Sequence, residues 1–299
     1  MPEDPDVADI RDRFRGIDPH KQGGERSPHR PLLVLYALGK LEAGERRLSY
    51  EQIDQEVGAL LDAFGPPHHT SAKYPFWYLQ KDGVWEVEEA DRLPRRSGKK
   101  EPLVNAMKDR NTRGWFPDDV WTVLQEHPEL RRDITQMMLD KCFPATLHLD
   151  ILNAVGLASR TAYYSSNRPS RDPSFRENVL ETYDYRCAVC GFDLSVDGTP
   201  FALEAAHIQW YQYDGPNLVT NGLALCALHH KMLDKGVIHV NTDLRLLVAE
   251  DVNGSTLHLE RLLEKHGEEI YTPQSVEHVP NEDYLRWHLN EVFRGAYTG

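Results

Sequence analysis

The spacing of apolar residues predicts a mostly helical first half of the chain. Between Arg30 and Leu41, leucine, valine and tyrosine side chains form a broad apolar face, and Gly44 follows soon after it. Ser49 starts a second helical pattern as its capping residue, and the run Gly65-Pro66-Pro67 ends that pattern. We expect further helices at residues 7–14, 102–109, 117–126 and 129–139.

One short stretch of the first half departs from the helical pattern. Phe76–Gln80 and Val84–Val87 are rich in apolar residues, and Lys81-Asp82-Gly83 separates them. An Asp-Gly pair between two such runs is typical of a hairpin turn. We therefore expect a mainly helical N-terminal domain with one small β-hairpin.

The strongest change of composition lies at residues 159–173. This segment is rich in serine, proline and arginine and has little apolar periodicity, which is typical of a linker. We expect an N-terminal domain at residues 1–158, a linker at 159–173 and a C-terminal domain at 174–299. In the C-terminal domain the pattern predicts strands at 201–209 and 237–240 and helices at 175–183 and 227–233, with two more helices after Leu257.

Composition favours a soluble protein with two globular domains. Of its 299 residues, 40% are hydrophobic and 27% are charged. Because no run of about 18 apolar residues occurs, we expect no membrane span. The N-terminus is acidic and broken by prolines, unlike a secretory signal, and three of the 4 cysteines have metal-ligand spacing rather than a disulfide framework. These features predict a cytoplasmic location.

Charge argues against a protein that simply coats nucleic acid. The formal net charge is −13, and most of the acidic excess lies in residues 171–299. The first half nevertheless contains a basic segment made by Arg92, Arg95, Arg96, Lys99 and Lys100. A local basic face can bind phosphates while overall acidity suppresses indiscriminate binding. On charge alone, a solvated basic loop explains this segment equally well.

Four residues of the C-terminal domain have the spacing of a closed zinc site. The pair Cys187 and Cys190 is followed 36 residues later by the pair Cys226 and His229. Three thiolates and one imidazole complete a tetrahedral shell with no open position, so we expect a structural zinc ion. The alternative is that the cysteines are small buried apolar residues and His229 is a surface side chain.

Three residues that a structural zinc site does not need lie between and beside these ligands: His207, Asn221 and His230. With the runs Glu204–Ile208 and Asp234–Gly236, their order resembles the motif of HNH endonucleases. The resemblance implies a ββα-metal fold in which His207 is the general base and His230 binds a catalytic divalent ion, Mg²⁺ or Mn²⁺. It also implies that Asn221 holds the imidazole of the base or the loop backbone by hydrogen bonds.

The C-terminal motif departs from many HNH enzymes at one position. Those enzymes place a metal-binding Asp or His directly before the base, where this chain has Ala206. Glu204 lies two residues earlier on the same face of the predicted strand and is a candidate replacement, although a structural role explains it as well. Asp214 is a weaker candidate. His229 and His230 are neighbours on a predicted helix, so their side chains should diverge by about 100°.

The N-terminal domain carries a second resemblance. The runs Pro28–Leu35 and Tyr74–Leu79, with Asp82-Gly83-Val84-Trp85, look like the sulfur-binding domain of McrA-like restriction endonucleases. That family recognises DNA whose backbone carries a phosphorothioate. The resemblance implies an apolar cavity that contacts sulfur, beside groups that donate to the phosphate. The residues expected in this site are His29, Arg30, Pro31, Tyr74, Pro75, Tyr78, Ser97, Gly98 and Lys99.

Together the two resemblances imply a modification-dependent restriction endonuclease. We expect an α+β protein whose helical N-terminal domain recognises phosphorothioated double-stranded DNA and whose zinc-stabilised HNH domain hydrolyses the backbone. A homodimer is expected, because cutting a duplex needs two active sites or two visits. Two alternatives remain open: an HNH nuclease directed at another DNA modification, and a non-catalytic DNA-binding protein that uses zinc only to fold.

Overall fold

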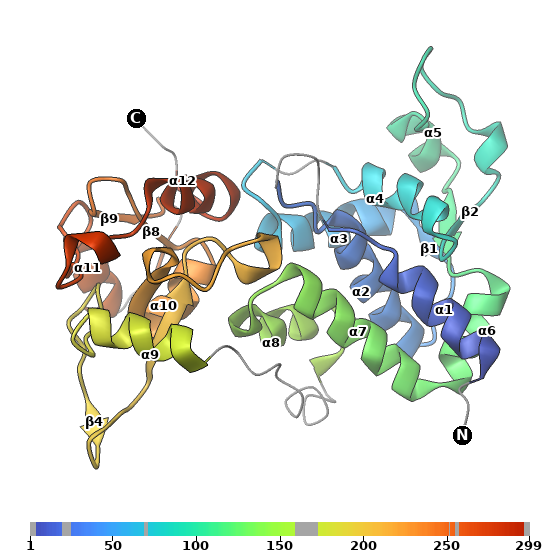
Figure 1. Ribbon diagram of the computed structural model, residues 1–299. Helices are drawn as coiled ribbons and strands as arrows, with labels where there is room; N and C mark the ends of the chain where they lie inside the picture. Colours follow the sequence, from blue (N-terminus) through green and yellow to red (C-terminus); the bar gives the residue numbers. More distant parts are fainter. Residues whose placement is uncertain are drawn as a thin grey trace. The chain divides into compact units, whose positions relative to one another are not determined.

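The computed structural model describes residues 4–19, 25–68, 71–158, 173–250, 252–254 and 257–295. The chain divides into two compact units, Met1–Asn167 and Arg168–Gly299, and each is described here by itself (Figure 1). The predicted linker lies outside the described residues except for its last residue, Pro173. Within the described ranges, no helix has the length and apolar character needed to cross a membrane.

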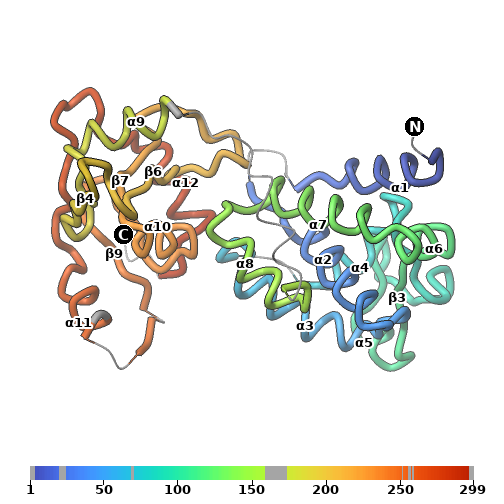
Figure 2. Tube along the Cα trace, turned by 90° about the horizontal axis from the view of Figure 1, so that it is seen from below, coloured from blue at the N-terminus to red at the C-terminus, as the bar shows by residue number. Residues whose placement is uncertain are grey.

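The N-terminal unit is built around one central buried helix, α2 (His29–Glu42). Leu32, Leu33 and Leu35 on this helix are completely buried, which explains the broad apolar face in the sequence. The helices that pack on α2 include α3 and α7, and Figure 2 shows how the helices of this unit are grouped. The remaining long helices confirm the predicted pattern, apart from α8, which was not predicted: α1 (Pro5–Arg15), α3 (Tyr50–Phe64), α6 (Asp118–Glu126), α7 (Pro128–Cys142) and α8 (Ala145–Ala154).

The predicted β-hairpin at residues 76–87 is wrong. The aromatic run forms a short helix, α4 (Lys73–Tyr78), followed by the 3-10 helix η1 (Leu79–Asp82). In the turn just before α4, the Ser71 hydroxyl accepts a hydrogen bond from the Lys73 amide at 3.2 Å. Gly83 has a φ of 70° and ends η1. The Asp-Gly pair that suggested a hairpin turn is therefore a helix terminus.

The β structure of the N-terminal unit is a small three-stranded antiparallel sheet instead. Its strands are β1 (Leu48–Ser49), β3 (Arg113–Trp115) and β2 (Glu86–Val87), in that order, so only the end of the predicted hairpin enters a strand. The 3-10 helix η2 (Ala90–Arg92) and α5 (Val104–Asp109) flank the exposed basic segment.

The C-terminal unit centres on a two-stranded antiparallel hairpin between two helices. Strand β6 (Leu203–His207) pairs with β7 (Gly222–Cys226), and His207 lies opposite Gly222. Helices α9 (Pro173–Thr182) and α10 (Ala227–Asp234) both pack against this hairpin (Figure 2). The predicted strand with His207 and the predicted helix with His230 are confirmed.

Further elements complete this unit. The predicted strand near residue 240 is β8 (Ile238–Val240), which pairs with the unpredicted β9 (Leu246–Val248). The tail forms the two expected helices, α11 (Leu257–Glu264) and α12 (Glu282–Glu291). The remaining short elements are β4 (Ser195–Val196), β5 (Thr199–Pro200), η4 (Tyr211–Tyr213), η5 (Val219–Asn221) and η6 (Val276–His278).

Candidate active site and zinc cluster

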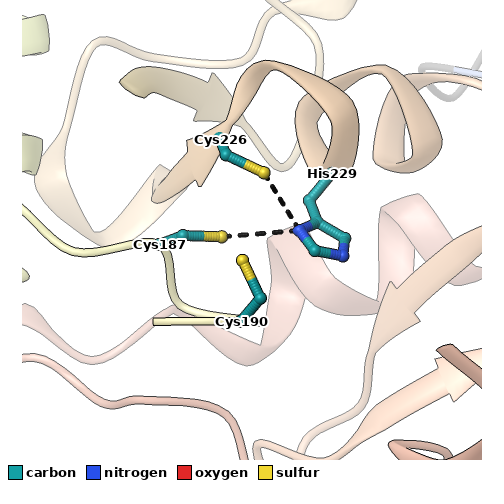
Figure 3. Close-up of side chains that lie close together, drawn as sticks. All are labelled: Cys187, Cys190, Cys226 and His229. Atoms are coloured by element: carbon teal, nitrogen blue, oxygen red, sulfur yellow. Dashed lines mark hydrogen bonds between the residues drawn. The ribbon is translucent and has the colours of Figure 1, made fainter. Parts of the chain in front are cut away.

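The four residues predicted to bind zinc form one cluster. The ligand atoms of Cys187, Cys190, Cys226 and His229 all lie within 4.8 Å of one another (Figure 3). The Nδ1 atom of His229 is 3.1 Å from the sulfur of Cys226 and 3.6 Å from that of Cys187. These separations suit donors that share a tetrahedral ion with bonds of about 2.0–2.3 Å.

The chemistry of the cluster also suits zinc. Hydrogen bonds from Cys187 and Cys190 lower the pKa of the Cys226 thiol, so the cluster favours a thiolate there. The first pair follows α9, and the second joins the end of β7 to the start of α10. A metal ion bound to all four would tie these elements together, and its closed shell would serve folding rather than catalysis.

His230 points away from the cysteine cluster and lies between two carboxylates. Its Nδ1 is 2.6 Å from Oε2 of Glu204 on β6, and its Nε2 is 3.3 Å from Oδ2 of Asp234 one turn along α10. The side chains of His230 and Asp234 are buried, whereas that of Glu204 is 45% exposed. The predicted divergence of His229 and His230 is therefore confirmed: one joins the cysteines and the other meets Glu204.

The two carboxylates decide the charge of His230 in this structure. Burial lowers the pKa of His230, but Asp234 and Glu204 outweigh this effect and raise the pKa to about 9. These two contacts therefore favour the protonated form of the His230 ring. A divalent ion, which is also a cation, would suit the same carboxylates.

His207 is the last residue of β6, and its ring is held on two sides. The ring stacks on Phe175 of α9, with ring centroids 4.1 Å apart and planes 19° apart. Its Nε2 is 2.9 Å from Oδ1 of Asn217. When Nε2 donates this hydrogen bond, Nδ1 is the basic nitrogen of the imidazole. Sequence reasoning missed both partners, because only the fold brings them to the strand end.

Asn221 fixes the loop that follows β6. Its side chain is completely buried. Its Oδ1 accepts from the Gln209 amide at 2.8 Å, and its Nδ2 donates to the carbonyls of Gln209 and Pro216, each at 3.0 Å. Of the two roles expected for Asn221, the structure shows the hold on the loop backbone. Because Pro216 precedes Asn217, this hold also positions the partner of His207.

The other candidates in this loop and strand are less engaged. Ala206 is completely buried and offers no metal ligand. Asp214 is exposed and adopts a left-handed backbone conformation, with a φ of 62°, at the end of η4. Among the acidic candidates, only Glu204 contacts a residue of the His–Asn–His set in the described contacts.

The predicted DNA site of the N-terminal unit gathers at the start of α2 and at α4. His29, Pro31 and Pro75 are buried. The Nη1 atom of Arg30 donates to both carboxylate oxygens of Asp82 on η1, at 2.7 and 2.8 Å, and its Nη2 donates to the Asp18 carbonyl at 3.1 Å. The guanidinium is therefore fixed beside η1.

Tyr74 and Tyr78 form the aromatic surface of α4. Their rings are stacked with centroids 6.3 Å apart and planes 5° apart. The ammonium of Lys73 lies 4.6 Å from the centroid of Tyr74, and that of Lys81 lies 4.6 Å from the centroid of Tyr78. This alternation of aromatic rings and cations is typical of surfaces that meet nucleic acid.

Ser97, Gly98 and Lys99 lie in an exposed turn of the basic segment, where Gly98 has a φ of 74°. This segment and Glu101, which directly follows it, contact α4. The Tyr78 hydroxyl donates to Glu101 at 2.9 Å, and the guanidinium of Arg95 lies 5.2 Å from the Trp77 ring. The predicted aromatic and basic parts of the site therefore lie in neighbouring parts of one unit.

Comparison with known proteins identifies the two units. Residues 7–160 match the family model described as ScoMcrA-like, DNA sulfur-binding domain, which spans more than half of the chain. The chain belongs to this family. Residues 187–241 match the HNH endonuclease family, and this match contains the cysteine cluster, His207, Asn221 and His230. The sulfur-binding domain is thus followed by an HNH endonuclease domain.

Several solved structures are similar to the chain. The sulfur binding domain of ScoMcrA complexed with phosphorothioated DNA is 23% identical, with a TM-score of 0.45, and the match covers 53% of this chain and 98% of that chain. The Type IV phosphorothioation-dependent restriction endonuclease ScoMcrA is 23% identical with a TM-score of 0.43, over 53% of this chain and 33% of that chain. The modification-dependent TagI restriction endonuclease is 28% identical with a TM-score of 0.30, over 41% and 38%. No curated protein matches the chain.

Proposed function

We propose that this protein is a restriction endonuclease that recognises phosphorothioated double-stranded DNA through its N-terminal unit and hydrolyses the DNA backbone with its C-terminal unit. The observation that carries the proposal is the presence, in one chain and in this order, of a DNA sulfur-binding domain and an HNH endonuclease domain. The organisation into two compact units supports separate recognition and cleavage.

In the recognition unit, α4 would supply the contact with the modified linkage. Sulfur is larger and more polarizable than oxygen, so the aromatic rings of Tyr74 and Tyr78 favour it, while the buried Pro75 supports α4 from beneath. Lys73, Lys81 and the basic segment would bind the flanking phosphates. Arg30 would approach the phosphate in the orientation set by Asp82. Discrimination of one atom should contribute about 1–3 kcal/mol, by analogy with a single methylene group in a pocket.

In the cleavage unit, His207 would act as the general base. As a water oxygen bonds to phosphorus, one proton of that water passes to Nδ1 of His207 and one phosphodiester P–O bond breaks. The hydrogen bond to Asn217 and the stack on Phe175 keep the ring in place. Asn221 maintains the loop that carries Asn217.

A divalent ion, Mg²⁺ or Mn²⁺, would be held beside His230 and would stabilise the negative charge on the phosphate and on the leaving oxygen. His207 and His230 are on different elements, and Glu204, which contacts His230, is three residues from His207, or about 10 Å along the strand. In the proposed reaction, the scissile phosphate would lie between the general base and the ion. The cysteine cluster would hold structural zinc.

A cleavage and binding experiment tests the two halves separately. Matched duplexes with and without one phosphorothioate are compared by gel shift and by cleavage with Mg²⁺ or Mn²⁺. We expect tighter binding and selective cutting of the modified duplex, and equal affinity for both duplexes would reject sulfur recognition. The His207→Ala variant should bind normally and cut at least 100-fold more slowly. The exposed His278→Ala variant serves as its control.

A further inference from the structure

Many HNH enzymes have a metal-binding side chain directly before the general base, and this chain has an alanine there. Ala206, directly before the base, is completely buried and has only a methyl side chain. Strand alternation places Glu204 on the same face of β6 as Ala206, and the carboxylate of Glu204 reaches His230 on α10. His207 faces the other side and stacks on α9.

We propose that Oε2 of Glu204 and Nδ1 of His230 are the two protein ligands of the divalent ion, and that Asp234 positions the His230 ring through Nε2. This inference rests on the proposed nuclease function, but it gives Glu204 and Asp234 roles that the His–Asn–His order alone does not assign. Three observations support it. They are the distance between Nδ1 of His230 and Oε2 of Glu204, the contact of the other His230 nitrogen with Asp234, and the greater solvent exposure of Glu204.

The spacing of the donors suits one shared ion. Nδ1 of His230 and Oε2 of Glu204 are 2.6 Å apart. Two ligands at right angles on an octahedral ion with bonds of about 2.1 Å are about 3 Å apart. A shift of a few tenths of an ångström would bring the two donors to this spacing, and Nδ1 would bind the ion in its unprotonated form.

Asp234 supplies the second contact that metal-binding histidines commonly have. Its carboxylate is 3.3 Å from Nε2 of His230, and its side chain is only 2% exposed. A buried carboxylate that accepts from one ring nitrogen fixes the tautomer and directs the lone pair of the other nitrogen to the metal. Asp234 is one turn from His230 on α10, so the helix itself sets this geometry.

The exposure of the site suits an ion that must meet substrate. The Glu204 side chain is 45% exposed, whereas those of His230 and Asp234 are 4% and 2% exposed. An ion held by Glu204 and His230 would therefore have its protein ligands on one side and open positions on the solvent side. Two protein ligands with water and phosphate oxygens in the remaining positions are typical of Mg²⁺ and Mn²⁺ sites. The cysteine cluster, with four ligands, leaves no such position.

Binding of Mn²⁺ to the zinc-loaded chain with both units present tests this assignment without relying on activity. Free Mn²⁺ is measured by electron paramagnetic resonance during titration. We expect Glu204→Gln, which keeps the shape of the side chain, and Asp234→Asn each to weaken Mn²⁺ binding by at least tenfold. Glu204→Asp should recover part of the affinity. The exposed Glu264→Gln variant is the matched control and should bind like the wild type.

Zinc content and circular dichroism, measured on each variant, show whether it is folded. His207→Ala should keep full Mn²⁺ affinity while it loses cleavage. Wild-type affinity in a folded Glu204→Gln variant would overturn the assignment, as would the absence of Mn²⁺ binding to the wild-type chain. If Mn²⁺ binding depends on Glu204 but no duplex is cut, the ion site stands and the proposed nuclease function fails.

Discussion

Replacing Asn217 gives the most direct test of how His207 is held. Oδ1 of Asn217 lies 2.9 Å from Nε2 of His207, a good distance for a hydrogen bond. Asn217→Ala removes this bond, so the ring loses the contact that keeps its proton on Nε2 and its basic Nδ1 available. Phe175 still stacks on the ring and preserves its plane. The expected effect is therefore smaller than the effect of removing the imidazole.

The size of the effect follows from the bond that is lost. A hydrogen bond between side chains contributes about 0.5–1.5 kcal/mol net, which corresponds to a decrease in kcat of about 2- to 13-fold. His207→Ala should cost at least 100-fold. Cleavage of a phosphorothioated duplex under single-turnover conditions measures both variants. The exposed Asn290→Ala serves as the control, because Asn290 lies on α12, away from the His207 loop in sequence.

Asn217→Asp separates a positioning role from a general loss of stability. A carboxylate next to an imidazole favours its protonated form and raises its pKa. Because a general base must be unprotonated, the acidic limb of the cleavage profile should move to higher pH. Wild-type rates and an unchanged pH profile in both variants would refute the role of Asn217.

Three further predictions test other parts of the molecule. Cys190→Ser, or removal of zinc by a chelator, should abolish the thermal transition of the C-terminal unit and leave that of the N-terminal unit, as differential scanning calorimetry would show. Asp82→Ala should weaken binding to modified and unmodified duplexes alike in gel shifts, because it frees Arg30 from its fixed orientation. Burial, assisted by the neighbouring His288, lowers the pKa of His239 to about 2 from an ordinary 6.5. The unfolded chain therefore takes up a proton below pH 6.5 that the folded chain does not, and stability should fall toward acid by up to about 1.4 kcal/mol per pH unit. Urea unfolding from pH 7.5 to 5.5 should show a flatter decline in His239→Phe.

The parts of the site that sequence predicted are those set by local geometry. Paired ligands three residues apart fixed the zinc cluster, and the helical turn fixed the divergence of His229 and His230. The apolar spacing of α2 and α3 likewise determined those helices, since a buried face repeats with the helical period. In each case the interacting residues are close in the chain or share one regular element.

The parts that sequence did not predict depend on contacts between distant segments. Tyr74–Tyr78 has the composition of a strand, but it forms a helix, α4, that packs on α2. A short apolar run does not reveal which period it will adopt. Asn217 and Phe175 come from a loop and a helix that meet only when the β6–β7 hairpin forms.

The acidic excess of the C-terminal unit affects how that unit would reach DNA in the proposed function. In residues 171–299, acidic residues outnumber basic ones by two to one. Such a unit is repelled by the DNA backbone and would find a duplex poorly on its own. Attached to a bound recognition unit, it would meet nearby DNA at a higher effective concentration than it would as a separate protein. Under the proposed function, the acidity of the cleavage unit would then protect unmodified DNA, because the active site would stay on a duplex only where the recognition unit is bound.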